Sequence, residues 1–161
     1  MQHIPAPMAR LVDGRQSQTA LAIQRGVRRL FARMEMASLT ELTLASGRRA
    51  DVISLGRDGA LVIVEIKSCL ADFRADRKWP GYRDFCDRFY FAVGHDFPHD
   101  VLPDETGLIV ADGFGAQIVR EAPEHPLAAA RRKAVTLRFA RAGASALHAL
   151  ADPEARAAAP L

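Results

Sequence analysis

The 161-residue sequence contains only two cysteines, Cys69 and Cys86. They stand far apart and form no CxxC pair, which argues against a structural zinc site and against a disulfide framework. No stretch reaches 18 consecutive apolar residues, so we expect no transmembrane helix and no membrane partner. The first residues also lack the apolar run of a signal peptide, and the cytoplasm is therefore the expected compartment.

The composition is that of an ordinary globular protein, with 49% hydrophobic and 25% charged residues. A chain of this length is expected to form one domain over residues 1–161, with enough apolar side chains for a core. Residues 1–15 show no periodic pattern and are expected to form a flexible arm, and residues 151–161 a frayed tail.

Charge is distributed unevenly, although the formal net charge is only +3. Residues 1–50 hold eight arginines against three acids, whereas residues 51–100 hold seven basic and nine acidic residues. This contrast suggests a phosphate-facing side and a metal-binding pocket, with Arg25 and Arg29 as candidate phosphate contacts. The alternative interpretation is a solvated face on an arginine-rich helix.

Hydrophobic periodicity predicts alternating helices and strands. A helix capped by Ser17 or Thr19 runs to about Met34. A strand, a hairpin, a mostly helical stretch, another strand, a second hairpin and a final helix follow. Their expected ranges are Ser38–Leu44, Asp51–Gly56 with Leu61–Ser68, Leu70–Cys86 broken near Pro80, Arg88–Val93, Gly107–Ala111 with Ala116–Arg120, and a helix opened by Pro126. The order α-β-β-β-α-β-β-α predicts a mixed sheet with helices on both faces.

The first hairpin is the most informative part of the sequence. Its expected three-residue loop, Arg57-Asp58-Gly59, ends on a glycine that can take the left-handed conformation. Counting back along both strands then places Asp51 directly across from Glu65. Because strand side chains alternate between faces, Lys67 projects from the same face as Glu65.

Two carboxylates that face each other across a ladder repel, and this repulsion destabilises a sheet. A hard divalent cation between Asp51 and Glu65 would remove the penalty, and Mg²⁺ is commonly held by one or two carboxylates, waters and substrate phosphates. The ammonium group of Lys67 could then pair with the anion under attack or activate a water. This is the layout of a metal-dependent phosphodiesterase.

Four segments of the chain carry a resemblance to a known family. They are TELTLASGRRAD from Thr40, VEIKS from Val64, ADFRADRKWP from Ala71 and YRDFCDRFYFAV from Tyr82. An aspartate followed at a distance by Glu-x-Lys is the signature of the PD-(D/E)xK nuclease-like superfamily, with Ala50 standing where proline often stands. The four segments together resemble the bacterial MmcB-like DNA repair proteins.

The resemblance implies an α/β fold with a restriction-endonuclease-like αβββαβ core. It implies that Asp51 and Glu65 bind Mg²⁺ or Mn²⁺, that the Ile66 carbonyl adds an oxygen, and that Lys67 orients or deprotonates the attacking water. It further implies DNA as the partner, with other repair proteins as additional candidates. Small nucleases of this superfamily often act as dimers, so a homodimer is a candidate assembly.

A third acidic ligand has two candidates. Glu41 lies in the first strand inside the matched stretch, whereas Glu35 ends the first helix, from which superfamily members often draw an acid. We prefer Glu41.

Further basic and aromatic residues are candidate DNA contacts. Arg48 and Arg49, just before Asp51, and Lys78 have the charge for phosphate contacts. Trp79 could stack on a base, although core packing is the commoner role of such a residue.

The leading hypothesis is therefore a DNA repair protein that hydrolyses phosphodiester bonds as a metal-dependent endonuclease. One alternative is a nuclease-fold module that binds DNA or a repair partner without cutting. A metal-dependent hydrolase of another substrate is a further alternative, which the arginine-rich first helix disfavours.

Overall fold

The computed structural model describes residues 17–154. The expected arm at residues 1–15, and residues 155–161 of the expected tail, lie outside the described part. The element order is α2 (Gln18–Arg33), β1 (Ala37–Thr43), β2 (Arg49–Leu55), β3 (Leu61–Lys67), α3 (Leu70–Ala75), the 3₁₀ helix η1 (Trp79–Phe85), β4 (Arg88–Val93), the 3₁₀ helix η2 (His99–Val101), β5 (Gly107–Ala111), β6 (Ala116–Arg120) and α4 (Ala129–Ala151).

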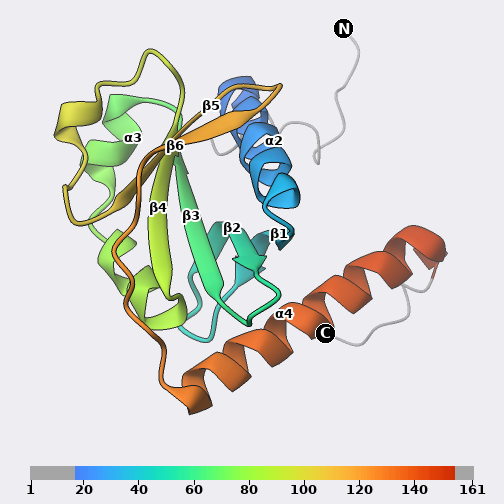
Figure 1. The fold of residues 1–161 in the computed structure, drawn as a ribbon. Coiled ribbons are helices and arrows are strands. Elements are labelled where there is room, and N and C mark those ends of the chain that lie inside the picture. Colours follow the sequence, from blue (N-terminus) through green and yellow to red (C-terminus); the bar gives the residue numbers. More distant parts are fainter. Residues whose placement is uncertain (1–16, 155–161) are drawn as a thin grey trace, which may run out of the picture.

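The six strands form one mixed sheet in the order β1-β2-β3-β4-β5-β6 (Figure 1). The pairs β1–β2, β2–β3 and β5–β6 are antiparallel, whereas β3–β4 and β4–β5 are parallel. The predicted α/β class, the mixed sheet and the αβββαβ order at its start are confirmed. None of the helices in residues 17–154 is long and apolar enough to cross a membrane.

Helix α2 covers one face of the sheet. Ser17 caps it as predicted, because its hydroxyl accepts a hydrogen bond from the Ala20 amide at 3.1 Å. The apolar stripe of α2 packs on the even-numbered valines of β2 and β3, with Phe31 against Val52 and Val64 in one buried cluster. These side chains fill the core on the α2 side.

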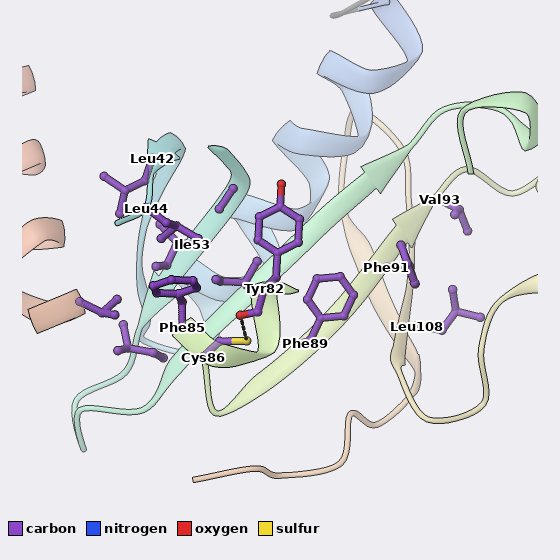
Figure 2. Close-up of a cluster of buried hydrophobic side chains, with 14 of the residues drawn as sticks. Leu42, Leu44, Ile53, Tyr82, Phe85, Cys86, Phe89, Phe91, Val93 and Leu108 are labelled. Carbon is purple, nitrogen blue, oxygen red and sulfur yellow. Dashed lines mark hydrogen bonds between the residues drawn. The ribbon is translucent and has the colours of Figure 1, made fainter. Parts of the chain in front are cut away.

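The opposite face is covered by α3, η1 and α4. Their buried side chains join the odd-numbered residues of β2, β3 and β4 in a second cluster that is rich in aromatic rings. Figure 2 shows the part in which Tyr82 and Phe85 of η1 stand beside Phe89 of β4. Tyr82 stacks on Phe89 with ring centroids 6.0 Å apart. Both faces of β2 and β3 are thus buried, as the apolar alternation on both sides of these strands predicts.

The predicted helical stretch 70–86 is divided in two. Helix α3 ends at Ala75, and the carboxylate of Asp76 then accepts hydrogen bonds from the amides of Lys78 and Trp79, at 2.8 and 3.2 Å. Pro80, which has no amide proton to donate, lies in the first turn of η1. The predicted interruption near Pro80 is therefore present, but it begins earlier, at Asp76, and the second half is a 3₁₀ helix.

Helix α4 begins at Ala129 rather than at Pro126, where the sequence predicts its start. The cause is Asp87, which lies at the start of β4. Its main-chain oxygen accepts from the His125 amide at 2.7 Å, and its carboxylate accepts from the Leu127 amide at 2.9 Å. Residues 125–127 are therefore held outside the helix.

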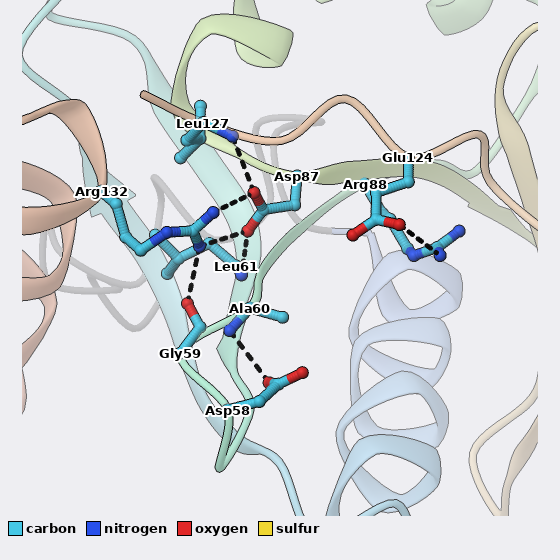
Figure 3. Close-up of polar contacts among 9 residues, drawn as sticks. All are labelled: Asp58, Gly59, Ala60, Leu61, Asp87, Arg88, Glu124, Leu127 and Arg132. Atoms are coloured by element: carbon cyan, nitrogen blue, oxygen red, sulfur yellow. Dashed lines mark hydrogen bonds and ion pairs between the residues drawn. The ribbon is translucent and has the colours of Figure 1, made fainter. Parts of the chain in front are cut away.

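Asp87 is also the centre of the most completely satisfied ion pair (Figure 3). Its side chain receives two hydrogen bonds from Arg132 of α4, at 2.6 and 2.7 Å, and one from the Leu61 amide at 2.8 Å. Burial acts to raise the pKa of Asp87, but the Arg132 guanidinium and the two amides outweigh it and lower the pKa to about 2. The pair ties α4 to the edges of β3 and β4.

We expect Asp87→Ala to reduce the free energy of unfolding by about 3 kcal/mol, because it leaves Arg132 and two amides without their acceptor. The matched control is Glu124→Ala, since Glu124 pairs with Arg88 at 3.4 Å on the open surface and such pairs contribute about 0–1 kcal/mol. Urea unfolding of both variants measures the difference. Equal losses would contradict the role assigned to Asp87.

Candidate active site

The β2–β3 hairpin has the predicted three-residue loop. The Gly56 amide donates to the Ala60 carbonyl at 2.9 Å, and Gly59 has the left-handed φ of 84°. The strands pair from Leu55 with Leu61 to Val52 with Val64. The same register, continued by one residue, sets Asp51 across from Glu65.

At Asp51 the backbone ladder is replaced by a side-chain contact. The carboxylate of Asp51 accepts a hydrogen bond from the Ile66 amide at 2.8 Å. Asp51 therefore reaches over the end of β3. Its carboxyl group also interacts directly with that of Glu65, so the two acids lie together, as predicted.

The two carboxyl groups strongly perturb each other. Burial, followed by the charge of Asp51, raises the pKa of Glu65 to about 8. Burial also raises the pKa of Asp51, and this outweighs the hydrogen bond from the Ile66 amide that lowers it. One oxygen of Glu65, Oε2, is buried and has no hydrogen-bond partner among the described residues. An acidic pair with an unsatisfied buried oxygen is therefore built into the end of the hairpin.

Lys67 is buried beside this pair, with 7% of its surface exposed. Its Nζ lies 2.8 Å from Oδ2 of Asp76 and 3.5 Å from Oε1 of Glu65. Burial acts to lower the pKa of Lys67, but the hydrogen bond with Asp76 and the surrounding carboxylates raise it above the usual value. Lys67 is thus held as an ammonium ion between two acids.

Two residues of the site were missed by the sequence analysis. Asp76 fixes the position of Lys67 and at the same time caps η1. An aspartate before a proline-containing turn indicates the cap, but no spacing rule connects it to Lys67. The Tyr82 hydroxyl donates to the Arg49 carbonyl at 2.8 Å. Burial, and then the charges of Glu65 and Asp51, raise the pKa of Tyr82 above its usual range.

The two candidates for a third acid lie in different places. Glu41 of β1 continues the row of acids beyond Asp51, and its charge contributes to the raised pKa of Asp51. It has an unusual left-handed φ of 56°, and its carboxylate lies 3.9 Å from Arg49. Glu35 instead pairs with Arg57 of the hairpin loop at 3.2 Å, at the other end of β2. The structure brings Glu41, and not Glu35, toward the acidic pair.

The predicted phosphate contacts fall into two groups. Arg48 and Lys78 are joined by a hydrogen bond from the Arg48 guanidinium to the Lys78 carbonyl, and Arg49 follows Arg48 at the start of β2. Arg49 lies 3.9 Å from the Glu41 carboxylate, and Lys78 follows Asp76 by two residues. Arg25 and Arg29 are on α2 and therefore on the opposite face of the sheet. The basic helix and the acidic pair thus lie on opposite faces, because the stripe of α2 packs on the even-numbered strand residues.

Trp79 is a packing residue. Its ring stacks on Phe89 with centroids 5.6 Å apart, and its edge meets Phe91 at 5.4 Å. The guanidinium of Arg83 lies 5.4 Å from the ring. Of the two roles considered for Trp79, base stacking and core packing, the structure shows core packing.

Comparison with known proteins places the chain in a family. The family described as DNA repair protein MmcB-like matches residues 7–154. The chain belongs to the MmcB-like DNA repair protein family. No curated protein matches this MmcB-like sequence. Among solved structures, a protein of unknown function from Silicibacter pomeroyi is 45% identical, with a TM-score of 0.83 over 86% of this chain and 95% of that protein. The membership gives the protein a role in DNA repair.

The donor set of this MmcB-like protein suits a hard divalent cation. Asp51 and Glu65 offer carboxylate oxygens, of which Oε2 of Glu65 has no other partner in the described chain, and the Ile66 carbonyl is adjacent in sequence. Residues 17–154 contain no cluster of three or more His, Cys, Asp or Glu side chains arranged for a metal. A cation here would therefore be bound by two carboxylates and complete its shell with water, as Mg²⁺ commonly does.

We expect the metal-free protein to lose stability as the pH rises from about 5 to about 8. Because the folded-state pKa of Glu65 is raised from 4.5 to about 8, its protonated form stabilises the fold below the ordinary pKa, and this contribution disappears as the folded pKa is passed. Asp51 shifts in the same direction. The fall should exceed about 1 kcal/mol in urea titrations with EDTA.

The variant Glu65→Gln should flatten this slope, whereas Glu105→Gln, at an exposed loop position, should keep it. Asp76 and Asp87 have lowered pKa values, so their contributions change at acidic pH, outside this range. If the free energy of unfolding of Glu65→Gln still falls between about pH 5 and about pH 8, the pH dependence comes from another group.

Proposed function

We propose that this MmcB-like protein is a metal-dependent DNA endonuclease that hydrolyses phosphodiester bonds and belongs to the PD-(D/E)xK superfamily. The observation that carries the proposal is the buried Oε2 atom of Glu65, which has no hydrogen-bond partner in the described chain although the charge of Asp51 acts on the same carboxyl group. A buried carboxylate oxygen without a partner costs free energy, and a bound cation would remove that cost. The role in DNA repair supplies the substrate class.

Asp51, Glu65 and the Ile66 carbonyl would hold Mg²⁺ or Mn²⁺. When bound, the ion would stabilise negative charge on the scissile phosphate and on the leaving oxygen. The amide of Ile66 orients Asp51 through the 2.8 Å hydrogen bond, so this carboxylate keeps its position without substrate. Such preorganisation lowers the reorganisation needed during the reaction.

Lys67 would act as a hydrogen-bond donor. Its pKa is raised, so it keeps its proton at neutral pH and is not suited to deprotonate a water in the metal-free site. From its place between Asp76 and Glu65 it would instead donate to a phosphate oxygen or orient the attacking water. Asp76 would serve as the positioning residue, since its carboxylate holds Nζ at 2.8 Å.

A DNA-binding repair module without cleavage activity is the second candidate. It is favoured by the small number of acids in the pocket, because the described chain offers no group of three ligands. In such a module the buried ammonium group of Lys67 would only stabilise the fold. Metal binding and cleavage separate the two candidates.

We expect millimolar Mg²⁺ to raise the melting temperature at neutral pH, because a ligand that binds only the folded state stabilises it by mass action. Asp51→Asn should abolish the shift, while Asp58→Asn, in the hairpin loop, should leave it intact. Thermal melts with and without the metal give the answer. If Mg²⁺ raised the melting temperature of both variants equally, the ion would bind at another site.

We expect Lys67→Ala to reduce cleavage by at least about 100-fold, the usual cost of removing one donor to a developing negative charge. DNA affinity should stay nearly unchanged, since one buried lysine supplies little of the phosphate contact. The control is Lys133→Ala, which removes the same charge from an exposed position of α4.

The assay uses single-stranded, nicked and mismatched DNA with Mg²⁺ or Mn²⁺, and the melting temperature of each variant is checked first. Wild-type protein that binds these substrates without cutting any of them would favour the binding module.

A further inference from the structure

A groove runs between the edge strand β1 and helix α4. Its volume is about 650 Å³, and residues 41–43 of β1 form one wall. The other wall is α4, which supplies Leu137, Arg138 and Arg141 among its lining residues. In Figure 1, α4 passes the sheet at this point, and its C-terminal half continues beyond the strands.

The charge of this groove is positive. Helix α4 carries five arginines and lysines and no aspartate or glutamate over its 23 residues. Two of them are engaged elsewhere, since Arg132 binds Asp87 and Arg131 lies 4.9 Å from the Phe85 ring. Arg138 and Arg141 are both exposed and line the groove.

Neither groove arginine is neutralised by an acid of α4. Within residues 17–154, Arg138 donates only to the Thr43 carbonyl, at 3.2 Å, and no ion pair joins Arg138 or Arg141 to an acid. Glu41 is the one acid in the groove wall, and Arg49 lies 3.9 Å from it. A positive charge is therefore left for a ligand of opposite sign.

The groove leads to the acidic pair. Glu41, in its wall, lies between Thr40 and Leu42, which pair with Val52 and Ala50 on either side of Asp51. The charge of Glu41 acts on Asp51, and the charge of Asp51 acts on Glu65. Helix α4 packs on the face that holds these acids, through Val135 and Phe139. The arginines of α2, by contrast, are separated from the acids by the sheet.

We propose that the groove between β1 and α4 binds the sugar-phosphate backbone of one unpaired DNA strand and leads it to Asp51 and Glu65. This inference deepens the proposed function and rests on it for the destination of the strand. Arg138 and Arg141 are one helical turn apart and contact successive phosphates, while Leu137, 54% exposed, offers an apolar contact for a sugar or base. A positive groove that follows the backbone is how proteins bind single strands.

An unpaired strand fits the depth of the site. The side chains of Glu65 and Lys67 are only 12% and 8% exposed, so a phosphate must enter a recess to meet them. A single strand can bend into a recess, whereas the phosphates of a duplex are carried on a stiff helix that costs free energy to bend. The recess therefore selects for separated strands, ends or flaps.

The test is a comparison of two double charge reversals. Arg138→Glu with Arg141→Glu changes the groove. Arg25→Glu with Arg28→Glu changes an equally spaced, exposed pair on α2, which lines a different groove on the other face. Both changes alter the net charge equally. Arg29 is left in place because it holds the β5–β6 turn through the carbonyls of Gly113 and Phe114.

Binding of a labelled single-stranded oligonucleotide is measured by anisotropy, in EDTA, over a range of salt concentrations. The α4 reversal should weaken binding at least about tenfold and reduce the salt slope by about 0.7 for each lost phosphate contact. The α2 reversal should change both quantities much less. The single variant Arg141→Glu changes a side chain that has no ion pair in the described chain, so it should fold normally. It should weaken binding by less than the double variant does, and it keeps the proposal testable if the double variant does not fold.

Unchanged affinity in the α4 variant, or an equal loss of affinity in the α2 variant, would contradict the proposal that the groove between β1 and α4 binds DNA. A blunt duplex that binds as tightly as the single strand overturns the choice of an unpaired strand. Because EDTA prevents cleavage, the result is independent of catalysis. Loss of binding in the α4 variant would support the groove even if the wild-type protein proved unable to cut.

Discussion

The register of the β2–β3 hairpin is the constraint on which the site depends. Gly59 closes a three-residue loop in the left-handed conformation, and that loop length decides which residue faces Glu65. A slip of one residue would turn Asp51 to the α2 side of the sheet and bring Val52 among the acids. The valines at 52, 62 and 64, packed under α2, oppose such a slip because it would expose them to the charged face.

The sheet separates two kinds of chemistry. One side is an apolar contact with α2 that leaves the helix arginines on the outer surface. The other side combines aromatic packing under η1 with the half-buried acids Asp51 and Glu65 and the buried Lys67. The low polarity of the aromatic neighbours keeps the acids poorly solvated, and this is why burial is the largest cause of their raised pKa values. Core and site are therefore built from the same side chains.

Local rules were sufficient for much of the fold. The Ser17 cap, the hairpin loop, β4 and the β5–β6 hairpin follow from neighbouring residues, and the structure has them where the sequence predicts. Asp76 and the late start of α4 could not be predicted in this way, because both depend on partners from distant segments. The same is true of the helix arginines, since a basic stretch carries no information about which face of a sheet its helix will cover.

Glu41 has a consequence beyond the acidic pair. Its left-handed backbone interrupts the pairing of β1 with β2 between Thr40 and Leu42. Because β1 is an edge strand, the interruption also breaks the outward row of amides and carbonyls that another chain could extend. Edge strands of this kind are protected from edge-to-edge aggregation by backbone irregularities and charges, and Glu41 supplies a left-handed backbone and a carboxylate. The residue that adds negative charge beside Asp51 thus also makes the edge of the sheet a poorer template for a strand of another chain.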